Sequence, residues 1–102
     1  MDIDDIKARV KIGNFRVSLH AEMEAEKDNL DIAQIVEAII NDHILEEYED
    51  TGRGESCLVV GFSDETPIHV VCGMRAENVI IVTVYIPSLP KFIDPWTRAS
   101  VE

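Results

Sequence analysis

The stretch Val79-Ile80-Ile81-Val82-Thr83-Val84-Tyr85-Ile86 decides how this chain of 102 residues folds. β-Branched and aromatic residues dominate it, which favours a β-strand. Its first four side chains are all apolar, so the strand is expected to lie centrally in a sheet that is covered on both faces. Further strands are expected before it, with short polar turns between them, at residues 44–48, 57–62 and 67–72. Short turns between successive strands predict an antiparallel meander.

Helical spacing of apolar residues replaces this pattern toward the amino terminus. Helices are expected over residues 2–12, 19–27 and 31–40. In the third helix, Asp31 followed by Gln34 predicts a capping box. In the second helix, Leu19 and Met23 stand one turn apart and are expected to face the core. The segment 15–17 before it is interpreted as either a short strand or an extended lead-in.

The chain shows no Pro-, Gly- or Ser-rich shift that would mark a linker, so we predict a single domain over residues 1–102. Its composition, 46% apolar and 28% charged, is that of a folded protein. The predicted fold class is α+β, with two or three amino-terminal helices packed on one face of a four-stranded antiparallel sheet.

Net charge narrows the classes of partner. Nine Lys and Arg residues against twenty Asp and Glu residues give a formal charge of −11. Such a charge repels phosphate, which disfavours indiscriminate binding to nucleic acid or anionic lipid, and it favours a partner with a basic face. No apolar run is long enough for a membrane-spanning helix, and the acidic start does not resemble a signal peptide. With only two cysteines, a cytoplasmic location is expected.

Cofactor and metal sites are not expected. No glycine-rich loop precedes a helix, so the sequence lacks a phosphate cradle. The three histidines and two cysteines do not show metal-ligand spacing. Cys57 and Cys72 are expected to be small buried residues rather than a redox pair.

His69 is the first candidate for chemistry because it stands inside a strand, in Pro67-Ile68-His69-Val70-Val71. A histidine among apolar neighbours must either find hydrogen-bond partners or lower its own pKa. Tyr85 stands on the next strand, and alternation would place it with Thr83 and Ile81. Whether His69 and Tyr85 share a face depends on strand register, since a slip by one residue reverses the answer. A structural histidine with an anchoring tyrosine therefore remains an alternative to a site.

Two further candidates lie elsewhere in the chain. His20 is in the first turn of the second predicted helix, where Glu24, four residues on, could orient it. The alternative is an ordinary surface histidine. Arg98 follows Trp96 by two residues and is a candidate anion contact, although Trp96 in this position more often covers the edge of a core.

Taken together, these pieces resemble the family called domain of unknown function 4258. The matching segments cover most of residues 16–97 in order: Ser18-Leu19-His20-Ala21-Glu22-Met23, residues 31–40, Leu58-Val59-Val60-Gly61, Pro67-Ile68-His69-Val70-Val71, Ile81-Val82-Thr83-Val84-Tyr85-Ile86-Pro87 and Trp96. The resemblance implies kinship with the RelE-type toxins of toxin–antitoxin pairs, in which helices pack on an antiparallel sheet. It also implies a small zinc-finger antitoxin-like protein as partner. The strong acidity departs from the usual basic character of RelE-type ribonucleases.

Two functions are consistent with these observations. The first is a protein-interaction module of toxin fold that binds a basic partner through its acidic surface, or pairs with a second copy. The second is a metal-independent endoribonuclease acting on RNA or the ribosome, with His20 or His69 as general base and Tyr85 as general acid. In that reading the phosphate contacts are Arg53, Arg75 and Arg98.

Overall fold

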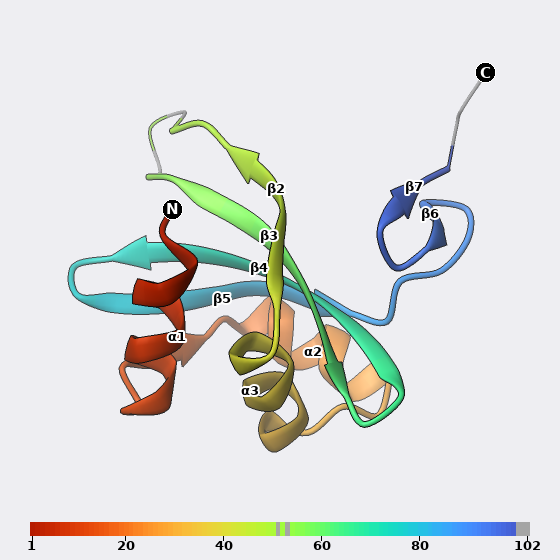
Figure 1. Cartoon of the computed structure of the whole chain (residues 1–102). Helices are drawn as coiled ribbons and strands as arrows, with labels where there is room; N and C mark the ends of the chain where they lie inside the picture. Colours follow the sequence, from red (N-terminus) through yellow and green to blue (C-terminus); the bar gives the residue numbers. More distant parts are fainter. Residues whose placement is uncertain (51, 53, 100–102) are drawn as a thin grey trace.

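Over residues 1–50, 52 and 54–99, which the structure describes, the computed structural model has three helices and two sheets (Figure 1). The helices are α1 (Ile3–Lys11), α2 (Leu19–Lys27) and α3 (Ile32–Ile40). The strands are β1 (Phe15–Val17), β2 (His43–Tyr48), β3 (Ser56–Ser63), β4 (Thr66–Arg75), β5 (Asn78–Tyr85), β6 (Phe92–Asp94) and β7 (Thr97–Arg98). The predicted α+β class is confirmed, and the capping box of α3 forms as expected.

The main sheet has the strand order β1-β5-β4-β3-β2. Strands β2 to β5 form the expected antiparallel meander, with β5 in an interior position. The prediction of four antiparallel strands is wrong, because β1 adds a parallel strand beside β5. A strand of three residues is too short to show alternation in sequence, and its pairing becomes visible only once β5 lies beside it. The β6–β7 hairpin forms a second small sheet that the sequence analysis did not predict.

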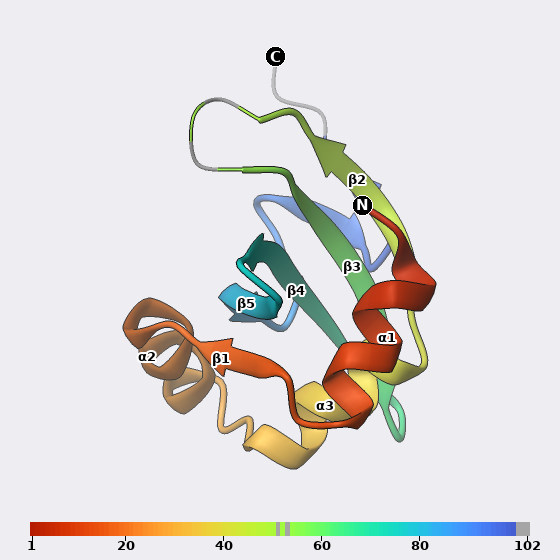
Figure 2. The same cartoon turned by 90° about the vertical axis from the view of Figure 1, so that its left-hand side faces the viewer.

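All three helices cover one face of the main sheet (Figure 2). The expectation that Leu19 and Met23 face the core is wrong, since 73% and 53% of their surfaces are exposed. Ala21 and Ala25 take that place against β5. Small side chains let the helix approach the sheet closely, and the hydroxyl of Ser18 sets its rotation by accepting from the backbone N–H of Ala21 and donating to the carbonyl of Val82.

Gly61 allows α3 to approach β3 very closely. A Cβ atom at this position would lie 1.9 Å from the carbonyl oxygen of Ala38 and 2.6 Å from its carbonyl carbon. Both atoms belong to the helix backbone, so a side chain could be accommodated only by moving the helix. The absence of a side chain here therefore determines the distance between the helix layer and the sheet.

Asp42, between α3 and β2, is buried without a matching partner. It is 2% exposed, and neither carboxylate oxygen accepts a hydrogen bond from a described residue. Lys7 Nζ on α1 is the nearest cation, 4.0 Å from Oδ1. Burial raises the pKa of Asp42 from 3.8 to about 7, against the opposing attraction of Lys7.

Cys57 and Cys72 lie opposite each other on β3 and β4. Both are free and fully buried among the helix-side core residues. Burial raises the pKa of the Cys57 thiol to about 11 and that of Cys72 well above its usual value. The two thiols are therefore protonated at neutral pH, as expected of small buried residues.

Among the described helices, none is long and apolar enough to cross a membrane.

Substitution of Gly61 by Ala is expected to destabilise the protein by at least about 1–3 kcal/mol, because the new methyl group displaces the α3 backbone. Gly73→Ala is the matched control, since a Cβ there meets its nearest atoms at 3.7 and 3.8 Å, ordinary contact distances. Urea unfolding of both variants measures the difference. Equal stability of the two variants would contradict the close approach.

The effect of Asp42→Asn on stability is expected to depend on pH. Because the carboxyl pKa is raised in the folded state, the wild-type protein loses stability as pH rises from about 4 through about 7, and the loss is complete above that range. The variant does not ionise, so at pH 8 it is expected to be about 1–3 kcal/mol more stable than wild type, and nearly equal to it at pH 4. Unfolding curves at several pH values test this. A difference that does not change with pH would contradict it.

Candidate functional site

A carboxy-terminal arm, residues 87–99, lies against the face of the main sheet opposite the helices, which we call the outer face (Figures 1 and 2). The carboxylate of Asp94 shapes its turn by accepting from the backbone N–H of Trp96 at 2.8 Å. The arm contacts the sheet through Phe92, which is 1% exposed, and through Trp96, whose ring centroid lies 5.7 Å from that of Phe62. The arm therefore covers one half of the outer face.

His69, the first candidate from the sequence, lies beneath this arm and is fully buried. Its Nε2 lies 2.6 Å from the carbonyl oxygen of Pro95, and its Nδ1 lies 3.1 Å from the hydroxyl oxygen of Tyr85. Because a carbonyl can only accept, the neutral imidazole carries its proton on Nε2 and donates it to Pro95. Nδ1 then accepts the hydroxyl proton of Tyr85. Both ring nitrogens are thus engaged by the protein itself.

A β-bulge in β5 sets the register that brings Tyr85 into contact with His69. Val71 pairs with Thr83 and Cys72 with Ile81, so Val82 is an extra residue on β5. The extra residue separates Ile81, which faces the helix-side core, from Thr83 and Tyr85, which face outward. The register then places Tyr85 directly opposite His69. The question that the sequence left open is settled, and the expectation that Ile81 shares a face with Tyr85 is wrong because of the bulge.

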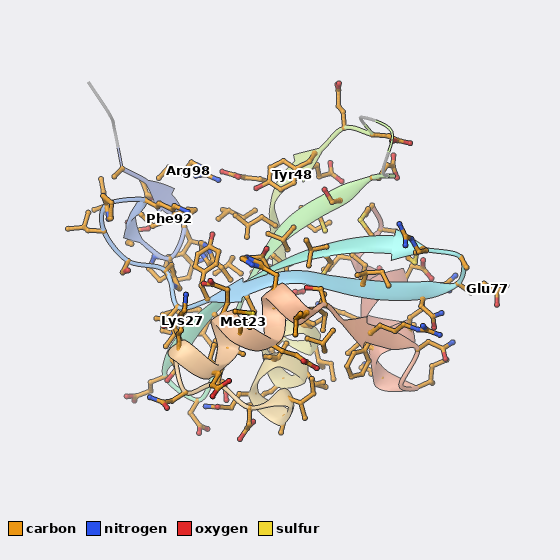
Figure 3. The ribbon with its side chains drawn as sticks, turned by 180° about the vertical axis from the view of Figure 1, so that it is seen from behind. Met23, Lys27, Tyr48, Glu77, Phe92 and Arg98 are labelled. Atoms are coloured by element: carbon orange, nitrogen blue, oxygen red, sulfur yellow. The ribbon has the colours of Figure 1, made fainter. Side chains whose placement is uncertain are left out.

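Phe92 and Arg98 complete the cluster around His69. The Phe92 ring stands nearly perpendicular to the imidazole, with centroids 4.4 Å apart. The Arg98 guanidinium lies over the Phe92 ring, 4.8 Å from its centre. Arg98 reaches from the arm to β2, where its Nε and one terminal nitrogen donate to the two oxygens of Glu46 at 2.6 and 2.7 Å (Figure 3). The Tyr48 hydroxyl donates to the same carboxylate.

The electrostatics of the cluster keep His69 and Tyr85 neutral. Burial lowers the pKa of His69 and raises the pKa of Tyr85. Hydrogen bonding from Arg98 lowers the pKa of Glu46 to about 2, so this carboxylate stays ionised and balances the guanidinium. Arg98 is thus paired bidentately with a carboxylate, which is the same geometry that it would use to bind a phosphate.

His20 and Tyr85 line a second feature, a pocket of about 430 Å³ between α2 and the start of the arm. Lys91 contributes a cation to this pocket, and Glu24 and Asp28 contribute carboxylates. The Asp28 carboxylate is already used, since it accepts from the backbone N–H of Ile86 at 2.9 Å. Tyr85 therefore stands between the two predicted histidines, one beneath the arm and one in the pocket.

The remaining candidate arginines do not join this cluster. Arg75 is exposed and is the last residue of β4, just before the turn that contains Glu77 (Figure 3), whereas His69 lies in the first half of this strand. Arg53 lies outside the residues that the structure describes. Among the described residues, no three His, Cys, Asp or Glu side chains converge as metal ligands.

Several residues of the His69 cluster and of the neighbouring pocket were not predicted from the sequence. Phe92 carries no periodic signal, because only a short apolar pair stands in Pro90-Lys91-Phe92-Ile93-Asp94. Glu46 belongs to the acidic run Glu46-Glu47-Tyr48-Glu49-Asp50, a pattern typical of a solvated strand edge. Lys91 stands in the same short segment as Phe92. The Asp94-Pro95 dipeptide was the available signal, since it is typical of a turn between two short extended segments.

Comparison with known proteins assigns the central part of the chain to a family. Residues 17–86 match the family model described as a domain of unknown function, DUF4258. No curated protein and no solved structure matches the chain. The matched residues include His20, His69 and Tyr85, whereas Phe92, Pro95 and Arg98 follow them in the arm.

Removing the buried ring with Phe92→Ala is expected to open the arm and return the pKa of His69 from its lowered value to about 6.5. Ile93→Ala is the control, because that neighbouring side chain is 64% exposed. An NMR titration of the imidazole Cε1–H signal measures both. An unchanged His69 pKa in Phe92→Ala would show that the arm does not keep water from the imidazole.

Proposed function

The chain belongs to the DUF4258 family, and from that premise we propose that it is a RelE-like protein of toxin fold that acts as the protein-interaction module of a toxin–antitoxin-like pair. Its partner is a small basic protein, of which the zinc-finger antitoxin-like class is the first candidate. The proposal requires this domain to bind a protein surface rather than to transform a substrate.

The main observation behind the proposal is that both ring nitrogens of His69 already form hydrogen bonds within the protein. A general base needs a free nitrogen directed at the substrate, and this imidazole donates to Pro95 and accepts from Tyr85. Arg98 is likewise committed to Glu46. The groups that would cut RNA beneath the arm thus serve to fasten the arm to the sheet.

The charge of the chain supports the same proposal. A net charge of −11 raises the cost of bringing a polyanionic RNA to the surface, and it speeds encounter with a basic protein. A second copy of the chain carries the same charge and would be repelled. A partner of opposite charge is therefore favoured over both RNA and self-association.

A second function is favoured by the pocket that His20 and Tyr85 share. There His20 would remove the 2′-hydroxyl proton and Lys91 would contact the phosphate. Tyr85 would give up its hydrogen bond to His69 Nδ1 and transfer that hydroxyl proton to the leaving oxygen. Burial keeps Tyr85 protonated at neutral pH, as a general acid requires. This arrangement would be a metal-independent endoribonuclease that does not use His69 as its base.

Two assays separate these functions. The full chain is co-expressed with the product of the adjacent gene and tested for a complex whose affinity falls with added salt, as expected of a charge-driven interface. In parallel, the purified chain is incubated with RNA and with ribosome-bound message in the presence of EDTA. We expect a salt-sensitive complex and intact RNA. Cleavage by the wild-type chain that is lost in both His20→Ala and Tyr85→Phe would overturn the interaction-module function and support the endoribonuclease function.

A further inference from the structure

The half of the outer face that the arm leaves uncovered contains a groove of about 580 Å³, which we call the open groove. Its floor is apolar and comes from Val71, Gly73 and Val82 on β4 and β5. The bulge residue Val82 is 39% exposed there, so apolar surface on this floor is in contact with solvent. Gly73 adds no side chain between Val71 and Val82, and a Cβ atom at this position would lie 3.7 Å from the carbonyl oxygen of Glu55 and 3.8 Å from Val82 Cγ2.

The rim of the open groove is acidic. Glu47 borders it from β2, Glu49 from the position directly after β2, and Glu55 from the position directly before β3. None of the described residues that line it is a lysine or arginine. Glu47 accepts from the amino group of Met1, whereas Glu49 and Glu55 form no ion pair within the described part of the chain. The rim therefore presents carboxylates that can pair with an incoming cation.

The covered half of the same face shows how this sheet holds a chain segment. There the arm places the Phe92 ring on the floor, against His69, and directs Arg98 to Glu46 on β2. The open groove repeats the two elements of that contact: an apolar floor on β4 and β5, and glutamates along the continuation of β2. No segment among the described residues occupies it.

We propose that the open groove binds a short basic segment of the partner protein, with an apolar side chain on Val71 and Val82 and Lys or Arg side chains at Glu49 and Glu55. This inference rests on the proposed function and adds to it the binding surface and the chemistry of the segment. Charge complementarity selects this occupant, because a second copy of the chain and an RNA strand both carry negative charge.

The test uses a synthetic peptide, acetyl-Arg-Val-Val-Arg-Arg-Val-Val-Arg-amide, titrated into the full chain at low salt and followed by calorimetry and NMR. One control peptide has Glu in place of Arg, and another has Ser in place of Val. The groove variants are Glu49→Lys/Glu55→Lys and Val82→Ser. The matched control is Glu22→Lys/Glu26→Lys, which changes the net charge by the same amount on exposed positions of α2, on the helix side of the sheet.

We expect the Arg–Val peptide to bind, and the double substitution at Glu49 and Glu55 to weaken it about tenfold, while the α2 variant changes the affinity by less than about twofold. Val82→Ser and the Ser-containing peptide should each weaken binding by about threefold through loss of apolar contact. Thermal unfolding of each variant confirms that it is folded.

The two proposals fail in different ways. If the peptide and the product of the adjacent gene both fail to bind wild type, the chain has no basic partner, and the proposed function is overturned together with the groove. If binding occurs but the α2 variant weakens it as much as the groove variant, the partner is basic but the open groove is not its site. Self-association of the free chain through the groove, seen by sedimentation and abolished by Val82→Ser, would assign the groove to a second copy instead.

Discussion

The requirement that the buried imidazole of His69 find partners for both nitrogens is the constraint on which the outer face depends. A histidine with no exposed surface loses water on both sides of its ring, and an unpaired nitrogen there would be costly. The Tyr85 hydroxyl satisfies one nitrogen from within the sheet, and the Pro95 carbonyl satisfies the other from the arm. The arm is thereby held in one position, with Phe92 and Arg98 packed around the same ring.

This arrangement divides the outer face into two halves with different roles. Under the arm, apolar side chains and an arginine–glutamate pair are supplied by the chain itself, so this half is complete. Beyond the arm, the floor at Val71 and Val82 is open, and Glu49 and Glu55 on its rim have no cationic partner among the described residues, whereas Glu47 pairs with the amino group of Met1. One half of the outer face is thus covered by the arm, and the other half is open to a partner. The excess of acidic residues over the whole chain agrees with a basic partner for the open half.

Much of the fold could be predicted from sequence because its signals are local. The α3 capping box, the Ser18 cap and the alternation of β3 and β4 each involve residues close together in the chain. The errors have a common cause, since each depends on contacts between distant segments. Strand β1 exists because β5 offers it an edge, and the phase of α2 is set by how closely Ala21 and Ala25 pack on that strand.

The candidate site divides in the same way. His20, His69 and Tyr85 could be chosen from sequence, because histidine in an apolar strand and tyrosine beside it are chemically unusual positions. Whether these side chains lie on the same face of the sheet could not be predicted. A single extra residue, Val82, forms a bulge, and because of it the residues before the bulge point to the opposite face from the one their spacing to Tyr85 predicts.

By itself, then, the sequence determined the acidic character, the order of helices and strands and the meander, because these follow from composition and from short-range periodicity. Only the tertiary structure decided that His69 is an internal anchor rather than an exposed base, and that Arg98 is paired with Glu46. Both outcomes depend on an arm with weak local signals of its own. Its position is stabilised by the burial of Phe92 and by hydrogen bonds to residues far away in the chain.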